Sequence, residues 1–377
     1  MKPKLKIPPK AKRLLSELSK EADKRGTPLY LVGGAVRDFA LGYSTRDLDF
    51  TVEGDPTPLV DFCSKLVNAK PVPFDSFGTW RLIGGKAWDI DFATTRKEEY
   101  PSPASLPVVS KPAPILEDLK RRDFTINAMA LRLAGKGFPD LIDPFNGLKD
   151  LENKVIQILH PESFRDDPTR VFRAARYAGR LDFNCSEEIL RLSYEALKAG
   201  YPQKLSRHRL SSELLKILSE KDPNPILNQL RDWGYLDLID PQLSALSWPD
   251  WKGFSAESRL GILAFSFREN AEKFLASLSL PRDISNAIVV SLKIAREKSA
   301  PREELPKLSQ EILKFLFPKI SPSALLPLKI SGKDLEALGI NPGPAMGEWL
   351  KKISSLQWRG KIKSKSEAIR WLKKSIH

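Results

Sequence analysis

The chain of 377 residues contains very little cysteine and histidine, with two residues of the first and three of the second. Cys63 and Cys185 stand far apart and lack the close spacing of zinc ligands, and so few thiols fit a reducing compartment. The histidines are His160, His208 and His377. These scarcities argue against a zinc site and against catalysis built on histidine.

Long hydrophobic runs are also missing. No uninterrupted apolar stretch approaches the roughly 20 residues that span a bilayer, and the first ten residues, MKPKLKIPPK, lack the apolar core of a signal peptide. We therefore expect a cytoplasmic protein with no membrane partner. With 41% hydrophobic residues, a chain of this length is expected to form two or more domains. Nothing in the sequence indicates an oligomeric state.

Negative charge is in deficit. The chain has 61 Lys and Arg against 47 Asp and Glu, which gives a net charge of +14. This excess favours a polyanionic partner such as nucleic acid, although charge alone fits a solubilising surface equally well. Its distribution favours nucleic acid, because residues 351–377 hold nine Lys or Arg and one acid, Glu367, with Trp358 and Trp371 among them. We expect this C-terminal segment to contact a phosphate backbone.

One motif is compact and unusual, the stretch LVGGAVRDFALGYSTRDLDF at residues 31–50. It begins as a buried strand, Gly33 and Gly34 permit a tight turn, and the residues that follow have helical spacing. Such a strand–turn–helix leaves amide groups free to bind phosphate. Asp47 and Asp49 alternate with apolar residues, so they project from one face of a strand, where a divalent metal would relieve their repulsion. The combination indicates a phosphate site followed by a metal-binding pair.

Further acidic and basic candidates come later in the chain. Asp89 and Asp91 share one face of the expected strand AWDIDFATTR, and either could join the first two aspartates in holding two Mg²⁺ ions. In LKRRDFTINAMA, Arg121 and Arg122 are natural phosphate clamps, whereas Asp123 could accept hydrogen bonds from a ribose. A salt-bridged helix start on the surface explains the same residues equally well.

The stretch FRDDPTRVFRAARYAGRLDF predicts a helix that begins at Pro168 with Asp167 as its N-cap. Arg170, Arg173 and Arg176 form a basic stripe along it. Asp167 and Arg170 would also make a base reader, because the carboxylate accepts the exocyclic amine of cytosine or adenine and the guanidinium donates to the adjacent ring acceptor. Uracil and guanine present the opposite polarity, and a mispaired buried polar group costs ~1–3 kcal/mol. Both interpretations of Asp167 stay open.

The order of patterns predicts an α+β fold. TPLYLVGG, DLDFTVEG, TWRLIGG and AWDIDFATT read as strands and PLVDFCSKLVN as a helix, whereas helical patterns dominate from about residue 150 onward. We therefore expect a mixed head followed by an all-helical remainder. Pro- and Lys-bearing stretches near residue 300 and at 318–327 are expected to be joints in the organisation of the chain.

These motifs, together with DPFNGLKDL and LSRHRLSSELLKIL, have the order and approximate spacing found in class II tRNA nucleotidyltransferases. The chain resembles these CCA-adding enzymes, which are related to bacterial poly(A) polymerases. Its late segment ISGKDLEALGINPGPAMGEWL is also similar to bacterial members, so the resemblance covers nearly the whole chain. Two positions depart from the family pattern: Asp166 stands where Glu is usual, and His208 where Glu is common.

The resemblance implies a polymerase-β-like nucleotidyltransferase head (1–140), a helical neck with the base-selecting motif (141–200), a helical body (201–300) and a basic helical tail that binds tRNA (301–377). The implied activity is template-independent addition of C, C and A from CTP and ATP to tRNA 3′ ends. Enzymes that add only A or only CC, a poly(A) polymerase and a non-catalytic tRNA-binding protein are the alternatives. CC-adding members typically have a shortened loop before the Arg-Arg-Asp motif, and residues 97–120 are not evidently shortened.

The resemblance also implies roles for individual residues. The catalytic and metal-binding set, with two Mg²⁺ ions, is Asp47, Asp49 and Asp91, the last matching the family's third acid better than Asp89. The nucleotide-binding set is Gly33, Gly34, Arg37, Arg121, Arg122, Asp123, Asn127, Asp167, Arg170, Arg173 and Arg176. The tRNA-binding set is Lys361, Lys363 and Lys365.

Overall fold

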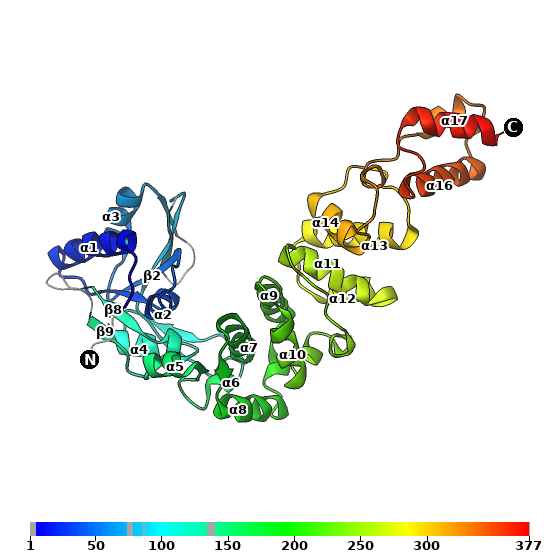
Figure 1. Ribbon diagram of the computed structural model, residues 1–377. Helices are drawn as coiled ribbons and strands as arrows, with labels where there is room; N and C mark the ends of the chain where they lie inside the picture. Colours follow the sequence, from blue (N-terminus) through cyan, green and yellow to red (C-terminus); the bar gives the residue numbers. More distant parts are fainter. Residues whose placement is uncertain (1–4, 74–77, 86, 134–139, 377) are drawn as a thin grey trace. The chain divides into compact units, whose positions relative to one another are not determined.

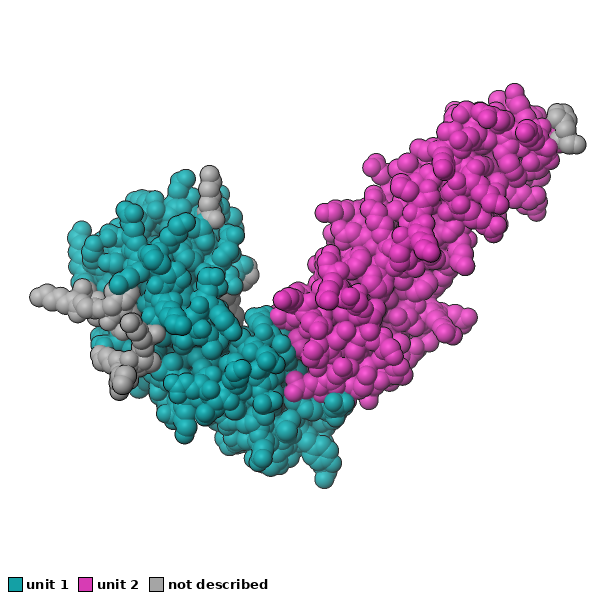
Figure 2. All heavy atoms as spheres, viewed as in Figure 1, with its two compact units in different colours: residues 1–205, 232–235 teal, residues 206–231, 236–377 magenta. Residues whose placement is uncertain are grey.

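The computed structural model describes residues 5–73, 78–85, 87–133 and 140–376 (Figure 1). The chain divides into two compact units, residues 1–205 with 232–235 and residues 206–231 with 236–377 (Figure 2). The first unit holds a mixed sheet and several helices, and the described part of the second is helical. This confirms the predicted α+β fold.

A seven-stranded sheet organises the first unit, in the order β3-β4-β5-β2-β1-β8-β9. Its two central strands β2 and β5 run parallel, and the other neighbouring strands pair antiparallel. All four predicted strand segments are confirmed as strands of this sheet. The strands are β1 (Leu29–Val32), β2 (Asp47–Val52), β3 (Lys70–Pro73), β4 (Thr79–Ile83), β5 (Asp89–Thr94), β8 (Ala130–Arg132) and β9 (Asp140–Ile142).

Alternation along β2 and β5 separates a packed face from a polar face. The rings of Phe50 and Phe92 stack with centroids 4.9 Å apart, and both side chains are fully buried. Asp49 and Asp91, one residue earlier on each strand, project from the opposite face because successive strand residues alternate. Burial of the aromatic face therefore fixes which way the acids point.

Helices surround the sheet and continue the first unit (Figure 1). The predicted helix after the glycine turn is confirmed as α2, and α1 lies against α3. The helices are α1 (Pro9–Lys24), α2 (Gly34–Leu41), α3 (Thr57–Val67), α4 (Ile115–Lys120), η1 (Thr125–Asn127), α5 (Gly147–Asn153), α6 (Ser163–Asp166), α7 (Thr169–Leu181), α8 (Glu187–Lys198) and η2 (Pro202–Lys204); the short strands are β6 (Lys97–Glu99), β7 (Val108–Ser110), β10 (Val155–Ile156) and β11 (Asn184–Cys185).

The second unit is a succession of helices. No helix in the described part of the chain is long and apolar enough to cross a membrane. The elements are α9 (Arg207–Leu218), α10 (Asn224–Asp232), η3 (Leu236–Leu238), η4 (Pro241–Ala245), α11 (Ala256–Ser266), η5 (Arg268–Asn270), α12 (Ala271–Ser277), α13 (Arg282–Glu297), α14 (Lys307–Leu316), η6 (Pro322–Leu325), α15 (Gly332–Glu336), α16 (Pro344–Trp358) and α17 (Lys365–Ser375).

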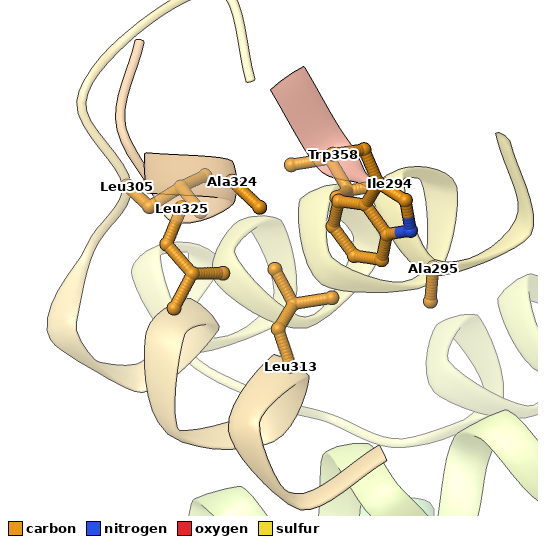
Figure 3. Packing of buried hydrophobic residues seen from close by; sticks show 7 residues of the cluster. All are labelled: Ile294, Ala295, Leu305, Leu313, Ala324, Leu325 and Trp358. Atoms are coloured by element: carbon orange, nitrogen blue, oxygen red, sulfur yellow. The ribbon is translucent and has the colours of Figure 1, made fainter. Parts of the chain in front are cut away.

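Of the two tryptophans in the C-terminal segment, Trp358 is buried and Trp371 is half-buried, which corrects their expected place on a phosphate-contacting surface. Trp358 is 9% exposed and meets the ring of Phe317 edge-on, with centroids 5.1 Å apart. Trp371 packs against the core of the last helices and lies 5.9 Å from Trp349. The indole of Trp358 closes an apolar cluster of Ile294, Ala295, Leu305, Leu313, Ala324 and Leu325 (Figure 3).

The two proline-bearing stretches contribute buried residues to the same cluster. Both stretches lie within the second unit, where they connect α13 to α14 and α14 to α15. Leu305, Ala324 and Leu325 from these connections are buried in the cluster around Trp358. The connections are therefore packed parts of the second unit.

Gly147, the first residue of α5, lies unusually close to another backbone segment. A Cβ at this position would stand 2.3 Å from the carbonyl oxygen of Thr125 and 3.1 Å from Cγ of Met129. Asp143 fixes the turn, because its carboxylate accepts hydrogen bonds from the amides of Gly147 and Leu148, at 2.7 and 3.0 Å. Only glycine fits without moving α5 away from η1.

We expect Gly147→Ala to lower the free energy of unfolding by about 1–3 kcal/mol, the usual range for overpacking a tight site. A Cβ at Gly347 in α16 would meet no described atom within 4 Å, so Gly347→Ala is the matched control and should be neutral or slightly stabilising. Urea unfolding followed by circular dichroism measures both. Equal stability of the two variants would contradict the close approach.

Candidate active site

Carboxylates line up across the two parallel strands of the sheet. In the register of β2 with β5, Asp47 stands opposite Asp89, and Asp49 opposite Asp91. Withdrawal of water by the surrounding protein raises the pKa of Asp49, although its side chain reaches solvent; Arg122 opposes this shift, and the charges of Asp91 and Asp47 add to it. Asp49, Asp91 and Asp47 therefore form one electrostatic group.

Arg81 on β4 closes this row and was missed by sequence reasoning. It stands opposite Asp91 in the antiparallel register and binds both carboxylate oxygens, Nε to Oδ1 at 2.9 Å and Nη2 to Oδ2 at 2.7 Å. Within the described residues, no group of three or more His, Cys, Asp or Glu side chains is arranged to hold a metal ion.

The glycine turn lies beside the acidic row. Gly33 has φ of +68°, and a Cβ there would stand 2.8 Å from Nη1 of Arg122 and 3.9 Å from Oδ2 of Asp49. The turn therefore brings the start of α2, a guanidinium and a carboxylate together. No described side chain caps the start of α2, which begins at Gly34. The predicted strand–turn–helix is present, and the guanidinium of Arg122 lies beside its turn at Gly33.

Arg121 and Arg122 are held by a buried carboxylate. The side chain of Asp118 is fully buried, and its Oδ1 accepts from Nε and Nη2 of Arg121 at 3.0 and 2.8 Å. Its Oδ2 accepts from Nη2 of Arg122 at 3.1 Å. Burial alone would raise the pKa of Asp118, but Arg122 and Arg121 hold it below its usual value. Asp118 thus orients both arginines, which follow directly after α4 at i+3 and i+4 from Asp118.

Arg121 has a second carboxylate partner, because it also donates from Nη1 to Oε1 of Glu98 at 3.2 Å. Arg122 has a buried Nε with no hydrogen-bond partner among the described atoms. The structure therefore turns Arg122, rather than Arg121, toward the glycine turn and Asp49.

Asp123 is the centre of a second buried network. Its carboxylate accepts from Arg173 and, at 3.1 Å, from Nδ2 of Asn127, whose own Oδ1 accepts from Nη1 of Arg37 at 2.8 Å. Burial acts to raise the pKa of Asp123, yet Arg173 and Asn127 hold it below its usual value. Four predicted site residues from three segments of the chain therefore meet in one network.

Tyr177 on α7 gathers the arginines of this region and was also missed. The guanidinium carbons of Arg37, Arg173, Arg176 and Arg180 lie 5.3–5.7 Å from its ring centroid. A tyrosine ring attracts cations through its electron-rich face. Two residues of the predicted basic stripe, Arg173 and Arg176, thus lie at this ring, whereas Arg170 binds the carbonyl of Arg121.

Asp167 and Arg170 lie where α6 gives way to α7. The helix α7 begins at Thr169, one residue later than predicted, with Pro168 rather than Asp167 at the N-cap position. Oδ1 of Asp167 nevertheless accepts from the amide of Thr169 at 3.0 Å and from its hydroxyl at 2.6 Å, so its carboxylate does bind the first turn of the helix. Arg170 is 4% exposed; its Nη2 donates to the carbonyl of Arg121 at 2.8 Å, and its buried Nη1 has no partner among the described atoms. The base-reading interpretation needs such an available donor.

The second unit holds the remaining predicted residues. Lys361, Lys363 and Lys365 are exposed, and Nζ of Lys365 pairs with Oδ1 of Asp334 at 2.6 Å. His208 on α9 lines a hollow of about 380 Å³ with neighbours that include Lys216, Ser212 and Glu257. None of these belongs to the acidic row of the first unit.

Comparison with known proteins gives the family. Residues 29–157 match the model of the poly(A) polymerase head domain. A CC-adding tRNA nucleotidyltransferase of Deinococcus radiodurans is 32% identical over 96% of this chain and 92% of that protein. An A-adding tRNA nucleotidyltransferase of Geobacter sulfurreducens is 30% identical over 95% of this chain, which spans only 46% of that protein's length.

Solved structures agree over the whole chain. The CCA-adding enzyme of Thermotoga maritima complexed with tRNA_CCA is 28% identical, with a TM-score of 0.62, and the match covers 99% of this chain and 97% of that one. A CCA-adding enzyme complexed with ATP is also 28% identical over the same shares, with a TM-score of 0.68. With the motifs, the sheet and these full-length matches in agreement, the chain belongs to the tRNA nucleotidyltransferase family, which is built on the poly(A) polymerase head domain.

Proposed function

We propose that this protein adds C, C and A to tRNA 3′ ends, taking the nucleotides from CTP and ATP without a template and releasing pyrophosphate. The observation that carries this proposal is the placement of Asp47, Asp49 and Asp91 in one row beside the Gly33 turn and Arg122. The names of the relatives support the substrate class. We place the reaction in the cytoplasm, in keeping with two free cysteines.

The acidic row fits Mg²⁺. Asp47 and Asp49 would hold the metal, and Asp91, beside Asp49, is the third carboxylate within reach of the group. A Mg²⁺ site commonly uses one or two carboxylates and takes its other ligands from water and substrate phosphates, so a preformed three-ligand cage is not required. When bound, two such ions would lower the pKa of the attacking hydroxyl and neutralise the negative charge of the leaving pyrophosphate.

The other side chains bind and orient the nucleotide. Arg122, with the free amides at the start of α2, is placed to hold the triphosphate. The hydrogen bonds among Asp123, Asn127 and Arg37 fix the orientation of these three side chains, which we assign to binding the ribose and the phosphates. Asp167 and Arg170 would select cytosine and adenine by the polarity of their edges. The protein thus contributes positioning and electrostatic stabilisation, which account for most of the catalysis of phosphoryl transfer.

A-adding activity is the second candidate. The name of the Geobacter sulfurreducens relative favours it. Residues 97–120 contain the strands β6 and β7 and the helix α4. A segment of this length, which is not evidently shortened, disfavours the CC-adding alternative.

Single-nucleotide extension separates these activities. We expect CTP to extend tRNAs that lack three or two terminal nucleotides and ATP to extend only tRNA that ends in CC, with Mg²⁺ present.

Asp49→Asn should slow addition by roughly 10³-fold, which equals about 4 kcal/mol of transition-state stabilisation, and should leave tRNA binding intact. Failure to use CTP would establish the A-adding alternative, and near-normal turnover of Asp49→Asn would sink the assignment of the acidic row.

Asp167→Asn tests the base reader against the helix cap. Asn caps helices about as well as Asp, and its Oδ1 can still accept from Thr169. We expect an unchanged melting temperature but a rise of about 5–150-fold in UTP or GTP use relative to CTP or ATP, since a mispaired buried polar group costs ~1–3 kcal/mol. Thr169→Val is the matched control, because it removes a cap partner without altering the carboxylate. Unaltered nucleotide preference in Asp167→Asn would leave only the cap.

Exposed lysines of the C-terminal segment should contribute to tRNA affinity through phosphate contacts. We expect the pair of changes Lys361→Ala and Lys363→Ala to weaken binding and to lower the log–log salt slope by roughly 0.7–0.9 per lost contact. Lys365→Ala should have a smaller effect, because Asp334 already neutralises that ammonium group. Fluorescence titration of labelled tRNA between low and physiological salt measures both quantities. An unchanged slope in the double variant would exclude these contacts.

A further inference from the structure

The row that holds the proposed metal ligands ends in a guanidinium. Arg81 of β4 stands opposite Asp91 of β5, which in turn stands beside Asp49 of β2. The side chains are therefore neighbours on one face of three adjacent strands. This placement follows from strand register, because cross-strand partners on one face lie about 4.5–5.5 Å apart.

Both oxygens of Asp91 are engaged by Arg81. Nε and Nη2 of the guanidinium contact Oδ1 and Oδ2 in parallel, at 2.9 and 2.7 Å. Such a fork matches the geometry of a carboxylate and neutralises its charge. Asp91 can then approach a metal only if the fork opens or shares an oxygen.

We infer that Arg81 is an internal counter-cation that competes with a divalent metal for Asp91. This inference rests on the proposed metal site. Without metal, the guanidinium offsets the repulsion between Asp91 and Asp49; with metal, its charge opposes the arriving cation. Arg81 and Asp91 have side chains that are 47% and 27% exposed, so water and an arriving cation can reach both groups of the pair.

Arg81 therefore acts as a positioning residue that sets how strongly the acidic row binds metal before substrate arrives. Weak metal binding in the free protein leaves room for the substrate phosphates to complete the metal's ligands, as Mg²⁺ sites generally require. Sequence alternation places Arg81 on one face of its strand, but only the pairing of β4 with β5 joins it to Asp91.

Mn²⁺ binding to the full chain tests the inference without relying on activity. Free Mn²⁺ is followed by electron paramagnetic resonance in the absence of nucleotide and tRNA. We expect Arg81→Met to bind Mn²⁺ at least tenfold more tightly than the wild type. Arg81→Lys retains the charge but cannot fork across both oxygens, so a smaller gain is expected. Arg132→Met removes an equal charge from β8, three strands from Asp91, and should not alter the affinity.

A second measurement follows stability. Without metal, Arg81→Met removes the guanidinium that pairs with Asp91, so its melting temperature should fall below that of the wild type. Added Mg²⁺ should raise the melting temperature of this variant more than that of the wild type. A merely structural arginine would lower stability without any gain in metal affinity.

The outcomes separate the inference from the proposed metal site. Equal or weaker Mn²⁺ binding by Arg81→Met, with normal binding by the wild type, overturns the role of Arg81 alone. If Arg81→Met does not fold, Arg81→Lys decides, and an affinity no higher than that of the wild type has the same meaning. Absence of Mn²⁺ binding by the wild type and by every variant would refute the metal site itself.

Discussion

Repulsion between carboxylates on adjacent parallel strands is the constraint around which the first unit is arranged. The register of β2 with β5 places Asp49 next to Asp91 on one face, while Phe50 and Phe92 stack on the other. The aromatic packing makes the acidic face unavoidable, because a shift by one residue would bury the acids and expose the rings. Positive charge must therefore be supplied locally, and the fork of Arg81 supplies it at Asp91.

Buried carboxylates supply the negative charge that pairs with the arginines of the site. Asp118 holds Arg121 and Arg122, and Asp123 holds Arg173. Breaking a buried ion pair leaves a carboxylate without a partner, which is energetically costly. Each guanidinium is therefore held in one direction before any substrate arrives. Side chains that are already oriented lose less entropy on binding, which is how a phosphate site gains affinity and rate together.

Much of this site can be predicted from local sequence, and the rest depends on pairing between distant segments. Alternation along 47–52 predicts that Asp47 and Asp49 share a face, because side-chain direction in a strand is a local property. The contact between Arg81 and Asp91 depends on the register of β4 with β5, which no local pattern specifies. The same limit explains Trp358: an aromatic residue among lysines has no local signal that tells a core position from a surface one, and the packing against Phe317 decides it.

The basic residues behind the net charge of +14 differ in how open they are to a polyanion. Around the acidic row, guanidinium groups are largely matched by internal carboxylates, as with Arg121 on Asp118 and Arg173 on Asp123. In the proposed function, a triphosphate bound there would exchange one set of charge-assisted hydrogen bonds for another, so its selection would depend on geometry more than on total charge. Lys361 and Lys363 are exposed, and the proposed phosphate contacts of these lysines would release counter-ions and make tRNA affinity dependent on salt. The proposal thus assigns long-range attraction to exposed lysines and local recognition to arginines that are held by buried carboxylates.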